Sequence, residues 1–467
     1  MPKPLHLHPD RLFPTEPAVR ALARQLYQQV AHLPIVSPHG HTDPAWFADN
    51  AAFAGATQLL LQPDHYVLRM LYSQGIPLAR LGIAPDASAT PREAWQLFAD
   101  HYHLFRATPS RTWLDWVFHE VFGLTVRLDT STADLYFDTI NDKLATSAFR
   151  PRALFERFNI EVLATTESPT DPLLQHQAIR ASGWQGRVIT AFRPDPVIDP
   201  QFEGFHEQLR RLGELTGEDT AGYCGYLAAL RNRRAYFASL GATSTDHGHA
   251  TAQTADLSAS EAGALFRRVT GTECSAADAE LFRAHMLTVM AGMSIEDGLV
   301  MQLHPGSFRN HNADLFARYG RDRGADIPCA TDYVRALRPL LNRYGNDPRL
   351  TFIVFTLDET TYARELAPLA GHYPAMKLGP AWWFHDSPEG MRRYREQVTE
   401  TAGFYNTVGF NDDTRAFLSI PARHDVARRI DCGMLARWVA EHRLEEWEAA
   451  EVAVDLAYNL VKKAYRL

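Results

Sequence analysis

The chain has 467 residues, of which 46% are hydrophobic and 22% are charged, and its formal net charge is -8. This is the composition of a globular protein whose core is large enough to fold without disulfides or a structural metal. The negative charge and the lack of Lys/Arg runs argue against a nucleic-acid partner. No apolar run has the length of a membrane span, and the first residues lack the apolar centre of a signal peptide. The four cysteines lie far apart, so we expect a cytoplasmic protein with free thiols.

The first predicted strand ends in two histidines. The stretch 35–43 (Ile-Val-Ser-Pro-His-Gly-His-Thr-Asp) reads as a short apolar strand that ends in His39 and His41, with Gly40 between them. In extended backbone, residues i and i+2 face the same side, so the two imidazoles can point at one metal ion. A His-x-His pair has many structural explanations, so this observation needs support from the rest of the chain.

Residues 44–157 are predicted to be almost entirely helical. Residues 90–93 (Thr-Pro-Arg-Glu) have the pattern of a capping box with proline at the first helical position. A helical block of this length directly after a strand indicates an insertion into a larger fold. We therefore divide the chain into an N-terminal segment with the first strand (1–43), a helical insertion (44–157) and the remainder of the fold (158–467).

From residue 158 onward, short β-rich runs alternate with helical stretches. Strand–helix alternation predicts a parallel sheet, and eight such units indicate a (β/α)₈ barrel, here with a large insertion after the first strand. The strands expected after the first one are 160–166, 188–192, 242–245, 299–303, 351–356, 375–378 and 407–410. Active sites of such barrels lie just beyond the C-terminal ends of the strands. The polar residues at those ends are His39, His41, Arg193, His247, His304, Asp413 and Arg415.

Asp413 is the natural third metal ligand, because strands one and eight are neighbours in a closed barrel. Two histidines and a carboxylate with open coordination positions suit zinc or another divalent ion. An N-cap role is the structural alternative for Asp413. His247 is a further ligand, a close neighbour of the metal, or a loop histidine bonded to backbone; His304 is more ambiguous still.

Further candidates for a substrate site are arginines and aromatic residues. Arg193, Arg309 and Arg415 can pair bidentately with a carboxylate, although surface ion pairing is the commoner role of arginine. Trp382 and the tryptophan after it are either a sugar-stacking wall or ordinary core. In the helical insertion, His65 and Tyr66 belong either to a lid over the barrel mouth or to a polar helix face.

These residues resemble those of uronate isomerase, the glucuronate/galacturonate isomerase of the amidohydrolase superfamily, and the resemblance covers almost the whole chain. The motifs that carry it are residues 38–41, 64–66, 165–169, 192–195, 246–248, 301–310, 381–384, 412–419 and 423–425. The chain departs from the family pattern at 165–169 (Thr-Thr-Glu-Ser-Pro), at 309–312 (Arg-Asn-His-Asn) and at 320–326 (Gly-Arg-Asp-Arg-Gly-Ala-Asp).

The resemblance implies a distorted (β/α)₈ barrel and one divalent metal, typically zinc, held by His39, His41 and Asp413 with His247 nearby. It implies a homo-oligomeric enzyme of carbohydrate metabolism. It also assigns six further positions to the substrate site: His65, Tyr66, Arg193, Arg309, Trp382 and Arg415.

The expected reaction converts D-glucuronate to D-fructuronate, D-galacturonate to D-tagaturonate, or both. Asp413 would remove the C2 proton and return it to C1; hydride transfer between these carbons is the rival chemistry. Tyr66 or His65 would move hydroxyl protons, while Arg415 and Arg193 would contact substrate oxygens and Arg309 the C6 carboxylate.

Three alternatives stay open. The first is a mononuclear metal-dependent hydrolase of a sugar-acid derivative; a two-metal hydrolase is disfavoured because residues 357–359 lack a histidine and no lysine follows the fourth strand. The second is a divergent isomerase of an altered uronate. The third is a barrel that binds sugar acids without catalysis.

Overall fold

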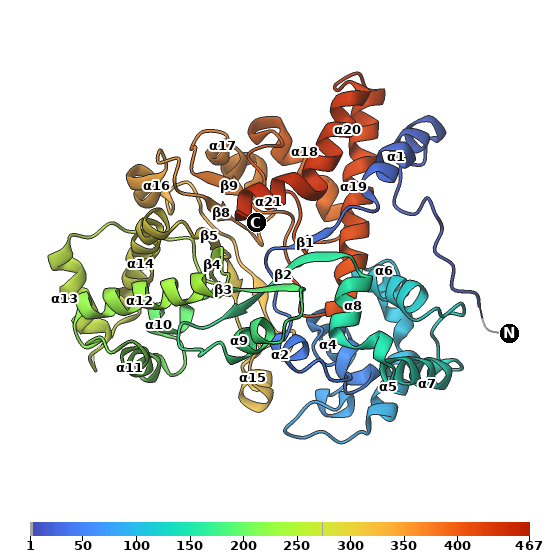
Figure 1. Cartoon of the computed structure of the whole chain (residues 1–467), viewed down its shortest axis with the longest axis horizontal. Helices are drawn as coiled ribbons and strands as arrows, with labels where there is room; N and C mark the ends of the chain where they lie inside the picture. The colour runs from blue at the N-terminus through green and yellow to red at the C-terminus, as the bar shows by residue number, and fades with distance from the viewer. Residues whose placement is uncertain (1–2, 273) are drawn as a thin grey trace.

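A computed structural model describes residues 3–272 and 274–467 of the chain, and a parallel sheet lies at its centre (Figure 1). The sheet curls into part of a barrel, and its seven strands follow one another in the order β1-β2-β3-β4-β5-β8-β9. They are β1 (Ile35–Ser37), β2 (Ile160–Glu167), β3 (Arg187–Phe192), β4 (Ser244–His247), β5 (Val300–Leu303), β8 (Phe352–Val354) and β9 (Met376–Leu378). The predicted distorted barrel and seven of its eight strands are confirmed.

The eighth predicted strand, residues 407–410, does not form. Thr407 makes a single parallel bridge to Leu378 at the end of β9. Gly409 has a φ of 76°, which interrupts an extended run. A Cβ on Gly409 would lie 2.6 Å from the carbonyl oxygen of Leu456, so the packing of the C-terminal segment requires this glycine. The hydrogen-bonded sheet among the described residues is therefore open between β9 and β1.

The loop after residue 410 nevertheless bridges this opening. The His41 backbone N–H donates to the Thr414 carbonyl oxygen at 3.0 Å. Strand one and the eighth segment are therefore neighbours, as the barrel prediction required, although they meet through loops and not through a strand ladder.

Between β1 and β2 the chain is helical, as predicted, and these helices gather at the lower right of Figure 1. Thr90 and Glu93 form the predicted capping box. The helices are α2 (Pro44–Asp49), α3 (Ala56–Leu60), α4 (His65–Ser73), α5 (Pro91–Asp100), α6 (Pro109–Trp116), α7 (Ala133–Leu144) and α8 (Pro151–Arg157). Their apolar side chains pack into one core with Ile35 of β1 and Ile160 of β2, so the helical block is continuous with the barrel. The division of the chain into three domains stays a prediction.

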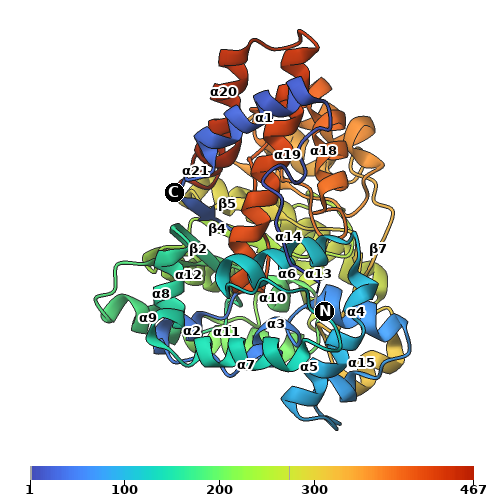
Figure 2. The ribbon, with the colours of Figure 1, turned by 90° about the vertical axis from the view of Figure 1, so that its right-hand side faces the viewer.

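The remaining helices surround the sheet, and Figure 2 shows α1 (Pro17–Val30) lying along the long helix α19 (Ile420–Ala440). The others are α9 (Leu174–Ala181), α10 (Asp195–Ile198), α11 (Phe205–Thr216), α12 (Tyr223–Ser239), α13 (Ala259–Val269), α14 (Ala276–Asp297), α15 (Ala313–Tyr319), α16 (Arg338–Tyr344), α17 (Ala367–Ala370), α18 (Pro388–Ala402), α20 (Glu446–Val454) and α21 (Leu460–Tyr465). Within the described ranges, no helix combines the length and the apolar character that a membrane crossing needs.

Several shorter elements complete the chain. Single turns of 3₁₀ or π-helix are η1 (Leu78–Leu81), η2 (Tyr102–Phe105), η3 (Val117–Val121), η4 (Ser147–Phe149), η5 (Tyr362–Leu366), η6 (Phe417–Ser419) and η7 (Asp455–Asn459). A small antiparallel hairpin, β6 (Ser307–Phe308) with β7 (Ile327–Pro328), follows β5.

Tyr465 of α21 closes the barrel interior. Its side chain is fully buried against interior residues such as Val300 and Ile353. Its hydroxyl donates to Gln302 Oε1 at 2.8 Å and accepts from Asn411 Nδ2 at 3.1 Å. Since Gln302 and Asn411 are themselves buried, this hydroxyl satisfies polar groups that have no access to water.

We expect Tyr465→Phe to destabilise the protein by about 1–3 kcal/mol, because two buried polar side chains lose a partner. Chemical denaturation measures this difference. Tyr458→Phe is the matched control: its hydroxyl bonds to Glu161 in a partly exposed position, so the loss there should stay below about 1 kcal/mol. Equal losses in the two variants would contradict the role given to Tyr465.

Candidate active site

His39, His41 and Asp413 meet beyond the ends of β1 and the eighth segment. Asp413 Oδ1 lies 3.4 Å from His39 Nε2 and 3.2 Å from His41 Nε2. His39 is buried and His41 is partly exposed. The structure thus brings the two neighbouring histidines together with Asp413, which lies near the other end of the chain.

Asp246 and His304 extend this cluster. Asp246 Oδ1 is 2.8 Å from His304 Nδ1, and the His304 ring stacks on the His39 ring with centroids 4.7 Å apart. His304 Nε2 is buried and has no hydrogen-bond partner among the described residues. Two overlapping triads, one of His39, His41 and Asp246 and the other of His39, His304 and Asp413, have ligand atoms within 4.8 Å of one another and could hold a metal ion.

The charges in this cluster depend on one another. Burial acts to raise the pKa of Asp413, but the neighbouring His39 and His41 outweigh it and hold that pKa well below its usual range. Asp246 behaves in the same way, with Arg193 as its strongest charged neighbour. Burial lowers the pKa of His41 and of His304. The cluster therefore combines ionised carboxylates with imidazoles that burial drives toward the neutral form, which is the form that binds metals.

His247 belongs to neither of these triads, so the structure does not bring it together with His39, His41 and Asp413. Its Nε2 lies 3.1 Å from Thr245 Oγ1, and its ring packs near His249. Alternate residues of a strand face opposite sides. Asp246 pairs in register with Gln302, which bonds to Tyr465 in the barrel interior, so Asp246 faces inward and His247 faces the surrounding helices. This alternation was readable in the sequence and points to Asp246.

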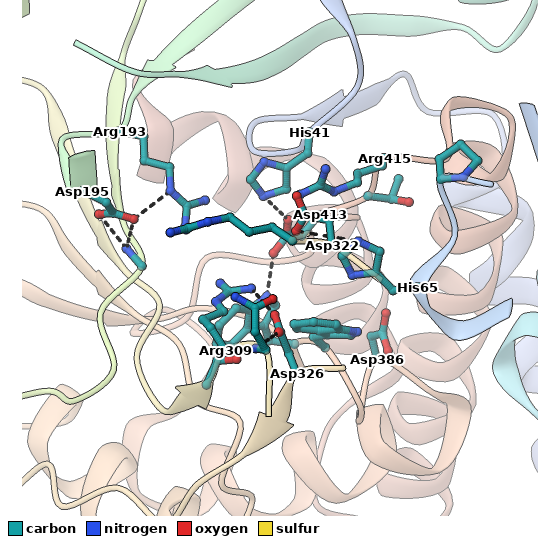
Figure 3. A pocket seen from close by; sticks show the side chains of 18 of the residues that line it. His41, His65, Arg193, Asp195, Arg309, Asp322, Asp326, Asp386, Asp413 and Arg415 are labelled. Atoms are coloured by element: carbon teal, nitrogen blue, oxygen red, sulfur yellow. Dashed lines mark hydrogen bonds and ion pairs between the residues drawn. The ribbon is translucent and has the colours of Figure 1, made fainter. Parts of the chain in front are cut away.

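A cavity of about 690 Å³ opens from the cluster toward solvent, and Figure 3 shows the side chains around it. A cavity of this size suits a small polar ligand such as a hexose acid. Among the predicted site residues it is lined by His41, His65, Tyr66, Arg193, Arg309, Trp382, Asp413 and Arg415. His39 belongs to the cluster behind it, and His247 lies outside both.

Each of the four arginines that dominate the cavity has a carboxylate partner. These partners were not identified from the sequence; apart from Asp195, which is two residues from Arg193, each lies at least 17 residues from its arginine. The pairs are Arg193 with Asp195 (2.8 Å) and Asp246 (3.0 Å), Arg309 with Asp326 (2.8 Å), Arg415 with Asp322 (3.1 Å) and Arg423 with Asp386 (2.7 Å). Two of these carboxylates come from the 320–326 segment, where the chain departs from the family pattern.

Helix α4 brings His65 and Tyr66 to the cavity. Asp64 caps the helix by accepting hydrogen bonds from the backbone of Tyr66 and Val67, so the next two side chains point from the first turn. The Tyr66 hydroxyl donates to Asp386 Oδ1 at 2.6 Å and accepts from the Phe384 backbone N–H at 2.7 Å. Burial raises the pKa of Tyr66 well above its usual value, so this phenol stays protonated and fixed.

His65 is held differently from Tyr66. Burial, aided by Arg415, lowers its pKa to about 4, so it is neutral near pH 7. Its Nε2 is buried and has no hydrogen-bond partner in the described part of the chain. The nearest carboxylate oxygen, Asp322 Oδ1, is 3.9 Å away. His65 is therefore free to exchange a hydrogen bond with a ligand.

Trp382 has a polar contact with the cluster. Its indole N–H donates to Asp413 Oδ2 at 2.6 Å, on the carboxylate oxygen that does not face the histidines. The next residue, Trp383, lies 5.5 Å from the His65 ring and beneath the Arg309 guanidinium. Trp382 thus orients Asp413, while Trp383 supports two residues of the cavity wall.

A second, smaller cavity of about 290 Å³ lies behind His41 and is lined by Glu167 among others. The carboxyl of Glu167 accepts a hydrogen bond from Thr190 and lies 3.8 Å from His176 Nε2. Burial raises the pKa of Glu167 to about 8, so this group is largely protonated at neutral pH.

Comparison with known proteins gives matches along the whole chain. A family model described as glucuronate isomerase matches residues 18–465. The uronate isomerase of Sphingopyxis alaskensis is 72% identical over 100% of both chains, and that of Rhizorhabdus wittichii is 74% identical over 99% of both. The crystal structure of glucuronate isomerase from Caulobacter crescentus superposes with a TM-score of 0.98 at 64% identity, covering 99% of this chain and 98% of that one.

We expect Glu167→Gln to flatten the pH dependence of stability. In the unfolded chain the Glu167 carboxyl loses its proton near pH 4.5, and in the folded protein only near pH 8. Between these pH values the folded protein therefore binds one proton more than the unfolded chain. The contribution of Glu167 to the free energy of unfolding is therefore fully present below pH 4.5 and is lost as the pH rises through 8. Denaturation at pH 4 and at pH 9 measures this: between the two pH values the free energy of unfolding of the variant should rise by roughly 5 kcal/mol relative to that of wild type. A constant difference across this range would contradict the assignment.

Proposed function

The chain belongs to the glucuronate isomerase family, so its activity is the isomerisation of a hexuronate, and we propose that it converts D-glucuronate to D-fructuronate and D-galacturonate to D-tagaturonate. The observation that carries this proposal is the convergence of His39, His41 and Asp413 on a cavity lined by arginines. An anionic sugar needs such arginines in a chain whose net charge is -8. Membership of this family favours the isomerase over the hydrolase and over a non-catalytic barrel.

We propose that His39, His41 and Asp413 hold one divalent ion, with zinc as the metal. The donor atoms support this proposal, because Asp413 Oδ1 lies 3.4 Å from His39 Nε2 and 3.2 Å from His41 Nε2, and a set of two imidazoles and one carboxylate suits zinc. A divalent ion bound there supplies Lewis-acid polarisation of the substrate oxygens at C1 and C2. Asp246 supports the site from behind by fixing both His304 and Arg193.

Asp413 is the proposed base that removes the C2 proton and returns it to C1. Its carboxylate is ionised, and its orientation is fixed by the Trp382 indole, so an oxygen is held at the cavity wall throughout the reaction. One carboxylate can serve both steps because C1 and C2 are adjacent carbons of the same open-chain sugar.

For the hydroxyl protons we propose His65 and not Tyr66. His65 is neutral and its Nε2 has no partner in the described chain, so it can accept and release a proton. The Tyr66 hydroxyl already donates to Asp386 and accepts from Phe384. Tyr66 is then a positioning residue that keeps the Asp386–Arg423 pair in place.

The arginines divide the substrate between them in this proposal. Arg193 is locked by Asp195 and Asp246 and would contact a substrate oxygen near the cluster, as would Arg415. Arg309, fixed by Asp326, lies on Trp383 and would face the C6 carboxylate. A homo-oligomeric state and a cytoplasmic location stay predictions.

We expect Asp413→Asn to lower the turnover of D-glucuronate and D-galacturonate by about 10²–10⁴-fold, because it removes the base. A panel of hexuronates assayed for ketose formation, with and without chelator, tests this together with the metal. Metal content measured on the same samples separates loss of the base from loss of the ion. Appreciable turnover by the variant would remove Asp413 as the base.

Running the reaction in D₂O distinguishes proton transfer from hydride transfer between C2 and C1. In D₂O, proton transfer through Asp413 should place solvent deuterium at C1 of the ketose, because a carboxylic acid exchanges its proton with water. Proton NMR of the product measures this incorporation. A ketose without deuterium at C1 would favour direct hydride transfer between C2 and C1.

A further inference from the structure

The cavity arginines differ in how firmly their carboxylate partners are held. Asp246, Asp326 and Asp386 are largely buried, and each accepts at least one further hydrogen bond, from His304, from the Asn310 backbone or from Tyr66. These carboxylates are therefore fixed parts of the wall.

The pair between Arg415 and Asp322 is different. It consists of one contact at 3.1 Å, and both side chains are about 40% exposed (41% and 40%). Within the described residues, no hydrogen bond holds the Asp322 carboxylate, and its other near neighbour is His65 at 3.9 Å. Figure 3 shows Asp322 beside Arg415 and His65 in the middle of the cavity.

The surroundings of Asp322 favour an anion. Burial acts to raise its pKa, but Arg415, followed by His65 and Arg309, outweighs burial and keeps the pKa below its usual value. These are residues that line the same cavity. A negative charge at this position is thus stabilised by groups that would also attract the carboxylate of a substrate.

The backbone presents this carboxylate from a short, anchored turn. Asp322 has a φ of 63° and lies between Gly320 and Gly324, which have φ values of 74° and 76°. Gly324 packs so closely on α4 that a Cβ there would lie 2.7 Å from the His65 carbonyl oxygen. Because the turn is anchored, Asp322 can leave Arg415 by rotation of its side chain toward solvent, without movement of the loop.

A second carboxylate beside Asp322 would cost free energy, since like charges in a partly buried site repel each other. Every arginine that lines the cavity already has a carboxylate within 4.0 Å; the fifth, Arg321, has the exposed Glu203. An anionic substrate must therefore compete with one of these partners. Among the partners of Arg193, Arg309, Arg415 and Arg423, Asp322 costs least to displace, because its pair with Arg415 is exposed and its carboxylate accepts no hydrogen bond from the described residues.

We propose that Asp322 is a resident anion of the substrate cavity, which neutralises Arg415 when no substrate is bound and is driven from it by charge repulsion when the C6 carboxylate of a hexuronate binds at the neighbouring Arg309. Asp322 then sets the affinity of the site for anionic ligands selectively: a neutral polyol can bind while Asp322 stays on Arg415, whereas a uronate must first release it. The proposal rests on the proposed function only in taking a hexuronate as the natural ligand.

The test compares two ligands that differ only at C6. L-Gulonate is D-glucuronate with its aldehyde reduced to an alcohol, and D-glucitol is the same polyol with a hydroxymethyl group in place of the carboxylate. Neither has an aldehyde, so neither can be isomerised. Isothermal titration calorimetry on the metal-loaded protein measures both dissociation constants for wild type, Asp322→Asn and Glu203→Gln.

Asp322→Asn removes the charge while keeping the turn, because asparagine tolerates the left-handed backbone that Asp322 adopts. We expect it to lower the Kd of L-gulonate about two- to fivefold, which is the range for losing a competing exposed ion pair. The Kd of D-glucitol should not change. Glu203→Gln removes a charge near the mouth that contacts no cavity arginine other than Arg321, and it should alter neither value.

Weaker binding of both ligands by Asp322→Asn would overturn the proposal, since Asp322 would then bind substrate hydroxyls. An unchanged Kd for L-gulonate, or no binding of L-gulonate by either protein, would overturn it as well. Equal tightening of both ligands would show that Asp322 acts by its volume and not by its charge, which also contradicts the proposal. A wild-type enzyme that isomerises no hexuronate would refute the proposed function and leave this binding result interpretable.

Discussion

The site depends on the contact of one carboxylate with two histidines from the opposite end of the chain. Asp413 Oδ1 lies within 3.4 Å of both imidazole nitrogens, and the other oxygen is held by Trp382. A buried carboxylate without such partners would be costly, and so would buried imidazoles without an acceptor. The barrel lets all of them be satisfied, because it places the end of β1 beside residues 411–414. Around this contact, Asp246 joins His304 and Arg193.

Much of the fold and part of the site could be predicted from the sequence, because they rest on short-range patterns. Strand–helix alternation identified the barrel, and the position of polar residues at strand ends identified His39, His41 and Asp413. For His247 the sequence left several roles open, and the alternation of strand residues, which points to Asp246, was the signal that could have separated the two neighbours. The eighth strand failed at Gly409, where contact with a distant carbonyl oxygen, invisible in the local sequence, imposes a left-handed backbone.

The carboxylates that pair with the cavity arginines lay beyond prediction for a different reason. Arg423 lies in α19 and Asp386 in the loop before α18, and Arg415 and Asp322 are brought together by a loop anchored on the helical insertion. Such pairs depend on tertiary packing and leave no periodic signal. They also explain how a chain with an excess of acidic residues can present several arginines to one cavity, because each arginine is paired with a carboxylate. Of the pairs named here, the one between Arg415 and Asp322 is the one that we expect a ligand to break.

The position of Tyr465 has a consequence for how the protein is made. This residue fills the barrel interior and bonds to Gln302 and to Asn411, two residues before Asp413. On a ribosome adding about 5–20 residues per second, Asp413 is synthesised roughly 20–75 s after His41, and Tyr465 later still. During that interval the nascent chain contains both histidines but lacks the Asp413 carboxylate. The proposed metal-binding residues His39, His41 and Asp413 are complete only after Asp413 is synthesised, and α21 with Tyr465 packs behind them later still. We therefore expect the rate of synthesis, and not the folding of the first half, to determine when the site forms.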